Sequence, residues 1–322
     1  MFSSMNISRL LYFLDHNFNN IRKHTMDSTR MIKCVTKCIP PLDGNKHKGQ
    51  AGRIGVVGGS LEYTGAPYFA GISALKVGAD LVHIFCTTPA ATVIKSYSPE
   101  LIVHPLLDRP KALAEISPWL DRLHAIVIGP GLGREPDTFK VVSDLIRTIR
   151  NCKIPLVIDA DGLFLITENP DLLKDFSSPV VLTPNKIEFE RLCNKPNGSS
   201  GLTQLGKNIL VFRKGATDET FSGNHEIQWK SDIGGSGRRC GGQGDILSGS
   251  IATFLHWTLS NHDTIDIINE DKLMAAASLS CYAASRLVRC CNEKSFKTKG
   301  RSMLATDMIE HIHEAFEELF QQ

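Results

Sequence analysis

The sequence predicts an α/β protein with a mostly parallel central sheet and helices on both of its faces. Six runs of strand length are almost continuously apolar and rich in β-branched residues, as expected for strands that are covered on both faces. Segments with helical periodicity alternate with these runs, which is typical of βαβ units. Of the 322 residues, 42% are hydrophobic and 22% are charged, so the chain can bury a sizeable core.

The predicted elements follow one another along the chain. The strands are expected at 54–59, 81–86, 125–129, 155–160, 180–183 and 209–213. The helices are expected at 66–78, 137–150, 185–193, 243–260, 272–291 and 307–320. The segment 219–229 is predicted to form an antiparallel hairpin at the sheet margin, turning at Gly223-Asn224. No repeat or low-complexity linker interrupts the chain after residue 50, so we expect a single catalytic domain over residues 40–322.

The first 39 residues differ from the rest in composition. Residues 1–38 contain six Lys or Arg and only two acidic residues, and apolar residues recur at helical spacing between Ile7 and Ile21. This pattern is typical of an organelle transit peptide. An ordinary helix packed on the domain, or translation from Met26 or Met31, accounts for it equally well. Because Pro40-Pro41 ends any helix, we interpret 1–39 as an N-terminal extension and expect a cytoplasmic or mitochondrial location, or both.

Charge and cysteine content exclude several classes of function. The net charge of +2 gives little attraction to polyanions, and no run approaches the 18 apolar residues typical of a membrane span. The nine cysteines lack zinc-ligand spacing and are expected to be reduced thiols. We therefore expect no nucleic-acid or membrane partner and look for a small-molecule site.

Glycine, acidic, amide or lysine residues follow five of the predicted strands. These segments are Gly58-Gly59, GPGLG at 129–133, DADG at 159–162, TPNKIEFE at 183–190 and KGATD at 214–218. Ligands bind to open parallel sheets at the carboxyl ends of the strands. One glycine after a strand commonly indicates only a turn, but five such segments at one edge predict a ligand site.

The segment GGQGD at 241–245 immediately precedes a predicted helix. Glycines leave backbone N–H groups accessible, and a helix N-terminus carries partial positive charge, so the segment is suited to hold a transferring phosphoryl group. Asp245 falls in the first helical turn, where its carboxylate can accept a proton from an attacking hydroxyl. The segment is neither a Walker A loop nor a dinucleotide-binding fingerprint. The alternative is a glycine-rich turn with Asp245 as an ordinary acidic residue at a helix start.

Several sequence blocks resemble a known family. GGQGD with the upstream SGRRC resembles the anion-hole and catalytic-base motif of the ribokinase-like superfamily, and Asn185 and Glu188 resemble its Asn-x-x-Glu motif. Over about residues 46–305 the chain is similar to the ATP-dependent NAD(P)H-hydrate dehydratase family. The similar blocks are, in order, KHKGQAGRIGVVGGSLEYTGAPYFAGISALKVGADLVHIFC, VIGPGLGR, VIDADGL, LTPNKIEFERL and GSGRRCGGQGD.

This resemblance implies a ribokinase-like three-layer sandwich and a role for each matching residue. Asp245 would be the catalytic base, and Gly242, Gln243 and Gly244 would form the anion hole. The implied ATP-binding residues are Lys214, Gly215, Ala216, Thr217, Asp218, Gly235, Ser236, Gly237, Arg238, Arg239, Cys240, Gly241, Gly242, Gln243 and Gly244. The implied substrate-binding residues are Gly131, Asn185, Lys186, Ile187, Glu188, Phe189, Glu190, Arg191 and Asp245. Mg²⁺ would accompany ATP, with Asn185 and Glu188 near it through water.

The implied reaction is the ATP-dependent dehydration of the S form of hydrated NADH or NADPH, which repairs the dinucleotide and gives ADP and phosphate. Phosphorylation turns a hydroxyl, a poor leaving group, into phosphate, which departs as the ring nitrogen donates electrons. One alternative is a kinase of the same superfamily acting on a small-molecule or vitamin alcohol. Another is a non-catalytic nucleotide-binding regulator, which would not need Asp245. The family also implies a functional pairing with an NAD(P)H-hydrate epimerase, and a homo-oligomer stays open.

Overall fold

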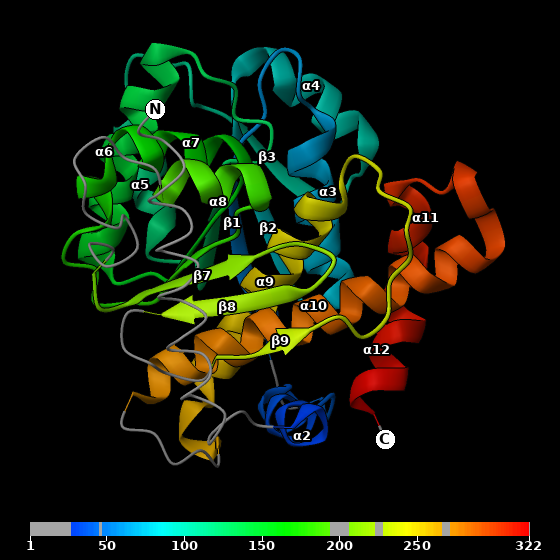
Figure 1. Cartoon of the computed structure of the whole chain (residues 1–322). Coiled ribbons are helices and arrows are strands. Elements are labelled where there is room, and N and C mark those ends of the chain that lie inside the picture. The colour runs from blue at the N-terminus through cyan, green and yellow to red at the C-terminus, as the bar shows by residue number, and fades with distance from the viewer. Residues whose placement is uncertain (1–26, 45–46, 194–205, 223–227, 266–270, 322) are drawn as a thin grey trace, which may run out of the picture.

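The computed structural model describes residues 27–44, 47–193, 206–222, 228–265 and 271–321. Its centre is a nine-stranded sheet in the order β3-β2-β1-β4-β5-β6-β7-β8-β9 (Figure 1). The first seven strands in this order run parallel, and β8 and β9 are antiparallel at one margin. The predicted α/β class with a mostly parallel sheet is confirmed.

The six apolar runs predicted as strands all form strands. The strands are β1 (Arg53–Val57), β2 (Leu81–Cys86), β3 (Leu101–Pro105), β4 (Ala125–Ile128), β5 (Leu156–Ile158), β6 (Val180–Leu182), β7 (Ile209–Arg213), β8 (Asp218–Ser222) and β9 (Lys230–Ser231). The predicted hairpin is confirmed in its strands, since Glu219 of β8 pairs with Lys230 of β9; its turn at Gly223-Asn224 lies outside the described residues. Strand β3 was not predicted from the sequence. Among the described strands it pairs with β2 alone, at the sheet margin, and its Ile102 is exposed, so it lacks the continuous apolar run of a central strand.

Side chains alternate between the two faces of the sheet, and each face has its own hydrophobic core. Ile54 and Val56 of β1 enter one core, whereas Val57 enters the other. The first core is covered by α2 (Ser28–Cys38), α3 (Gly65–Val77), α4 (Thr88–Tyr97), α9 (Gln243–Ser260), α10 (Lys272–Lys299), α11 (Ala305–Glu310) and α12 (Ile312–Phe320). The second is covered by α5 (Ala112–Leu120), α6 (Pro136–Cys152), α7 (Ala160–Glu168), η1 (Pro170–Leu173) and α8 (Lys186–Cys193). The molecule therefore has three layers.

Helix α9 begins at Gln243, as predicted, and its middle is buried between α3 and α10. A Cβ atom added to Gly249 would lie 2.0 Å from the carbonyl oxygen of Ala70 in α3, so the close approach of these helices requires glycine. The packing fixes α9 with its N-terminus at the carboxyl edge of the sheet. The helix predicted at 307–320 is divided at His311 into α11 and α12. Neither α9, α10 nor any other described helix is long and apolar enough to cross a membrane.

Helix α2 corrects the predicted domain boundary. Met31, Cys34, Val35 and Cys38 are buried in the same core as α9 and α10, and Figure 1 shows α2 close to α10 and α12. The Nδ2 of Asn261 also donates to the Cys38 carbonyl (3.1 Å). The packed domain therefore includes Ser28–Cys38 and does not begin at residue 40, while the apolar repeat at 7–21 lies outside the described residues. The buried residues of α2 have the i, i+3, i+4, i+7 spacing of an amphipathic helix. The basic residues between them gave the segment the composition of a transit peptide, so this spacing was not recognised.

Candidate active site

The polar segments after β1, β4, β5, β6 and β7 meet at one edge of the sheet, as the sequence predicts. The first three are pressed together through their backbones. A Cβ atom added to Gly58 would lie 2.1 Å from the Pro130 carbonyl oxygen, and one added to Gly129 would lie 1.8 Å from that of Asp159. Gly129 also has a φ of 121°, which residues other than glycine rarely adopt. These glycines therefore bring Asp159 close to the centre of the edge.

The N-terminus of α9 lies at this edge, and its N-cap residue, Gly242, has no side chain that could cap it. Gly242 occupies the N-cap position with a φ of 90°, and a Cβ atom added there would lie 2.7 Å from the Ala305 side chain. The backbone of Gln243 and Gly244 borders a cavity. Because the first N–H groups of a helix have no partner within the helix, they can bind an anion in that cavity.

A charged cluster of Lys214, Asp159, Glu188 and Asp245 lies beside this helix N-terminus. The Nζ of Lys214 donates to Oδ1 of Asp159 at 2.7 Å. A Cβ atom added to Gly244 would lie 3.3 Å from that Nζ and 3.7 Å from Oδ2 of Asp159. The ion pair therefore touches the first turn of α9.

The electrostatics of the cluster are unbalanced, because one ammonium faces three carboxylates. Burial raises the pKa of Asp245 to about 8; the charge of Asp159 adds to the rise, and Lys214 opposes it. Burial also raises the pKa of Glu188, against the hydrogen bond from Asn185 and the charge of Lys214. For Lys214, burial acts to lower the pKa, but the ion pair with Asp159 and the two other carboxylates outweigh it and raise the pKa. Lys214 therefore stays charged, and Asp245 is suited to accept a proton near neutral pH.

Asn185 and Glu188 form a reciprocal cap at the start of α8. The Oδ1 of Asn185 accepts hydrogen bonds from the N–H groups of Ile187 and Glu188 (2.9 and 3.0 Å). The Oε2 of Glu188 accepts one from the N–H of Asn185 (2.8 Å). The cap holds Glu188 near Lys214, and its second carboxylate oxygen accepts no hydrogen bond from the described residues.

The chemistry of these side chains fits a Mg²⁺ ion that is coordinated mainly by the phosphate oxygens of a bound ligand and by water. Among the described residues, no three Asp, Glu, His or Cys side chains converge to hold a metal ion. Mg²⁺ commonly uses one or two carboxylates, with phosphate oxygens and water completing its coordination. Glu188 is suited to such a contact. Asn185 is less suited, because its amide oxygen already accepts two hydrogen bonds.

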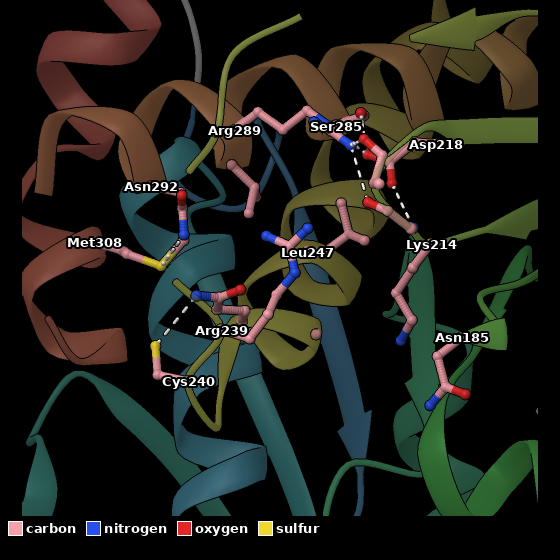
Figure 2. Close-up of a pocket in the computed structure, with 16 residues that line it drawn as sticks. Asn185, Lys214, Asp218, Arg239, Cys240, Leu247, Ser285, Arg289, Asn292 and Met308 are labelled. Carbon is pink, nitrogen blue, oxygen red and sulfur yellow. Dashed lines mark hydrogen bonds and ion pairs between the residues drawn. The ribbon is translucent and has the colours of Figure 1, made fainter. Parts of the chain in front are cut away.

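A cavity of about 500 Å³ lies beside the charged cluster (Figure 2). Lys214 and Asn185 lie on one side of it, Cys240, Asn292 and Met308 lie on the other, and the Arg239 side chain extends between them. Its lining includes nine of the residues predicted for ATP: Lys214, Gly215, Ala216, Asp218, Gly235, Arg239, Cys240, Gln243 and Gly244. The other six, Thr217, Ser236, Gly237, Arg238, Gly241 and Gly242, are in the adjoining loops and do not line it.

Helix α10 contributes residues to this cavity that the sequence analysis missed. Arg289 donates to Oδ2 of Asp218 (2.8 Å) and to the carbonyl oxygens of Gly215 (3.0 Å) and Gly234 (3.1 Å). The Asp218 carboxylate also accepts hydrogen bonds from the Ser285 hydroxyl (2.7 Å) and the Gly215 N–H (2.9 Å). Arg289 therefore joins the loop after β7 to the loop after β9. No motif in the helical segment 272–299 indicates this role.

The residues predicted for the substrate are divided by the structure. Gly131 lies in the compact loop after β4, where an added Cβ atom would be 2.7 Å from the Tyr63 carbonyl oxygen. Lys186, Ile187, Glu190 and Arg191 are exposed on α8. Phe189 is only 6% exposed and packs in the second core, because α8 needs an apolar face toward the sheet. Its side chain is therefore used mainly for the core, and its predicted contact with the substrate stays a prediction.

Asp161, whose role the sequence leaves open, supports the edge from the second face. Its carboxylate accepts hydrogen bonds from the Gly133 N–H (3.1 Å) and from Nε of Arg134 (3.0 Å). A smaller cavity of about 110 Å³ lies here, and Arg134, Asp161, Glu188 and Arg191 are among its lining residues. Glu188 therefore borders this smaller cavity and is not among the residues that line the 500 Å³ cavity.

The fold and the site together define the class of protein. A three-layer α/β sandwich with a mostly parallel sheet is of the ribokinase-like fold type, and here the N-terminus of α9 and Asp245 lie at its carboxyl edge. In line with this, the structure is similar to a ribokinase-like superfamily protein from Enterococcus faecalis, with a TM-score of 0.69, 20% identity and coverage of 90% of this chain and 95% of that one.

The chain belongs to the NAD(P)H-hydrate dehydratase family, which matches residues 54–314. It is 54% identical to the ATP-dependent (S)-NAD(P)H-hydrate dehydratase of Aedes aegypti, over 90% of this chain and 85% of that protein. It is 44% identical to the Homo sapiens protein of the same name, over 96% and 90% of the two chains. A Bacillus subtilis ADP/ATP-dependent NAD(P)H-hydrate dehydratase, co-crystallised with ATP/Mg²⁺, has the same fold, with a TM-score of 0.65, 20% identity and coverage of 89% and 97%.

Proposed function

We propose that this chain catalyses the ATP-dependent dehydration of the S form of hydrated NADH or NADPH, which restores the dinucleotide and gives ADP and phosphate. The observation that carries the proposal is the placement of Asp245 in the first turn of α9, whose uncapped N-terminus borders the cavity. Relatives that cover most of the chain and are named for this reaction support it.

The proposed roles follow from where each group lies. ATP occupies the 500 Å³ cavity, with its γ-phosphoryl group at the start of α9, where Gln243 and Gly244 line the cavity and Gly242 is the adjoining N-cap residue. The hydrated nicotinamide ring lies beside Asp245, toward Gly131 and the exposed residues of α8. The carboxylate of Asp245 accepts the proton of the C6 hydroxyl. The hydroxyl oxygen attacks the γ-phosphorus, and the bond between this phosphorus and ADP breaks.

Elimination then needs little further assistance from the protein. The phosphate ester at C6 is next to a ring nitrogen that can donate an electron pair, so the carbon–oxygen bond breaks and phosphate departs. Loss of a proton from the neighbouring carbon restores the dihydronicotinamide. A vitamin alcohol lacks the adjacent nitrogen, and its phosphate ester would persist.

Mg²⁺ is part of the proposal, with Glu188 as the side chain best suited to hold it and Asn185 contributing through water. When bound, the ion would neutralise charge on the phosphate oxygens. The Bacillus subtilis relative co-crystallised with ATP/Mg²⁺ supports this assignment.

The test combines two measurements on one mixture of purified protein, ATP, Mg²⁺ and hydrated NADH. We expect the absorbance of dihydronicotinamide to return, with one ADP and one free phosphate formed per molecule restored. Phosphorus NMR should show no lasting monoester. A persistent monoester without recovery of the absorbance would contradict the dehydratase and favour a small-molecule kinase.

We further propose that the residues before α2 direct part of the protein to mitochondria, and that an epimerase supplies the S form. Residues 1–27 contain three Lys or Arg and two acidic residues, and the apolar residues that recur at helical spacing between Ile7 and Ile21 support the targeting proposal. Addition of water to a trigonal carbon gives both epimers, which supports the pairing. A reporter fused to residues 1–27 tests the targeting, and a diffuse cytosolic signal would contradict it.

A further inference from the structure

The ion pair between Lys214 and Asp159 joins two segments of the sheet edge that are not neighbours. Lys214 follows β7 and Asp159 follows β5, so the two side chains meet across the end of β6, which lies between these strands. The Lys214 N–H donates to the carbonyl oxygen of Pro184 (2.9 Å), which ties the start of the lysine to the segment after β6. The lysine side chain is therefore fixed at both ends.

Asp159 is itself held rigidly. It is 2% exposed, and its Oδ1 accepts a hydrogen bond from the N–H of Ala160 (2.9 Å) as well as from Lys214. Ala160 has a φ of 48°, a left-handed conformation that is unfavourable for alanine. Such a conformation is found mainly where surrounding structure or function requires it. Here it lets the Ala160 N–H donate to Oδ1 of the carboxylate that bonds Lys214.

The ammonium lies where negative charge develops during the proposed reaction. It lies beside Gly244 at the first turn of α9, 3.3 Å from where a Cβ atom would be, and it is close to Asp245 and Glu188 as well as Asp159. A phosphoryl group that approaches this corner would meet three carboxylates. A cation next to the helix N–H groups offsets that repulsion and interacts with the equatorial oxygens of the transferring group.

We infer that Lys214 is a catalytic residue of the phosphoryl transfer and that Asp159 is its positioning residue. This rests on the proposed function. The C6 hydroxyl gives its proton to Asp245, its oxygen forms the bond to the γ-phosphorus, and the bond to ADP breaks. Lys214 keeps its proton throughout and stabilises the charge on the three phosphoryl oxygens. Asp159 holds the ammonium at the anion hole and does not contact the reacting atoms.

Lys214→Met is the first test, assayed with ATP, Mg²⁺ and hydrated NADH. We expect kcat to fall by about 10²–10³-fold, the loss typical of one removed donor to a transition-state anion. The KM for the hydrate should change by less than about threefold, because the lysine acts on the phosphoryl group in the transition state. Lys214→Arg should recover part of the loss, since it keeps the charge with another geometry.

Asp159→Asn tests the positioning role through non-additivity. Alone it should lower kcat by about 10-fold or more, but added to Lys214→Met it should cause no further loss. The double variant also keeps the test valid if Lys214→Met folds poorly, since it removes both charges of the buried pair. Equal, additive losses from the two substitutions would overturn the positioning role.

A pH profile separates catalysis from an indirect effect on Asp245. Removing Lys214 raises the pKa of Asp245, because the ammonium opposes the rise. If that were its whole role, activity of Lys214→Met would return at higher pH; we expect the loss to persist. Return of activity, or an unchanged kcat, would overturn the inference while the wild-type reaction stands. Failure of the wild type to consume ATP with the hydrate would instead overturn the proposed function.

Discussion

Two ion pairs lie at the two ends of the five-residue segment 214–218, and their surroundings differ. At the first end, Lys214 pairs with Asp159 beside two further carboxylates, Glu188 and Asp245. At the other end, Asp218 pairs with Arg289 at 2.8 Å, and both side chains are about nine-tenths buried. The Asp218 carboxylate is satisfied by a hydroxyl and a backbone N–H, and the guanidinium by loop carbonyl oxygens.

The difference shows how one loop serves both structure and chemistry. The Arg289–Asp218 pair has balanced charge and a full set of hydrogen bonds, so it can stabilise the loops without changing state. The Lys214 cluster has an excess of negative charge and borders an uncapped helix N-terminus, so its groups are available to a ligand and a proton. Each pair should therefore respond differently to substitution.

The largest effect is expected in the Lys214 cluster, where the charges are unbalanced. Asp245→Asn keeps the shape of the side chain but cannot accept a proton, so kcat should fall by about 10²–10⁴-fold. ATP affinity, measured by calorimetry without the hydrate, should stay within about threefold of wild type. Near-normal turnover would show that another group accepts the proton.

Substitution in the Arg289–Asp218 pair should affect the KM for ATP rather than kcat. Arg289→Met leaves Asp218 buried without its partner and releases two loops that line the cavity, so we expect the KM for ATP to rise by about 10-fold and Tm to fall. The kcat at saturating ATP should change by less than about threefold, because Arg289 is not next to Asp245. Arg289→Lys is the matched control; it keeps the charge without the planar fork, and should lie between the two. A large loss of kcat with an unchanged KM would contradict the distinction between the pairs.

A further expected effect, which needs no substitution, is a pH dependence confined to the Lys214 cluster. Asp245 acts when deprotonated, and burial raises its pKa to about 8. In the free enzyme kcat/KM should therefore rise about 10-fold per pH unit below that value and level off above it. ATP affinity, which depends on the balanced pair, should not follow this curve. An activity that is flat between pH 6 and about 9 would show that Asp245 has an ordinary pKa.

The central strands and the helix at Gln243 could be predicted because local sequence determines them. The apolar runs of β4 and β6 match strands buried on both faces, and the glycines before α9 match a helix start. The edge strand β3 and helix α2 could not be recognised in the same way. Ile102 of β3 is exposed, and the buried stripe of α2 has meaning only through its contacts with α10 and α12.

The site residues also differ in whether local sequence or tertiary packing determines their role. Lys214, Asp159 and Asp245 follow strands or open a helix, so the topology alone places them at one edge. Arg289 stands in the middle of a 28-residue helix, α10, where nothing in the neighbouring sequence marks it. Its role depends on the packing of α10 against the margin of the sheet. Phe189 shows the reverse, because a residue inside a motif is used for the core.

The central claim is that the hydroxyl of the hydrate leaves as part of phosphate. The direct measurement uses a hydrate labelled with oxygen-18 at the C6 hydroxyl, with unlabelled ATP and water. If the hydroxyl attacks the γ-phosphorus and the carbon–oxygen bond then breaks, every released phosphate should contain one labelled oxygen, visible as an isotope shift in phosphorus NMR. Label in water, with unlabelled phosphate, would show that the hydroxyl departs directly and would contradict the account.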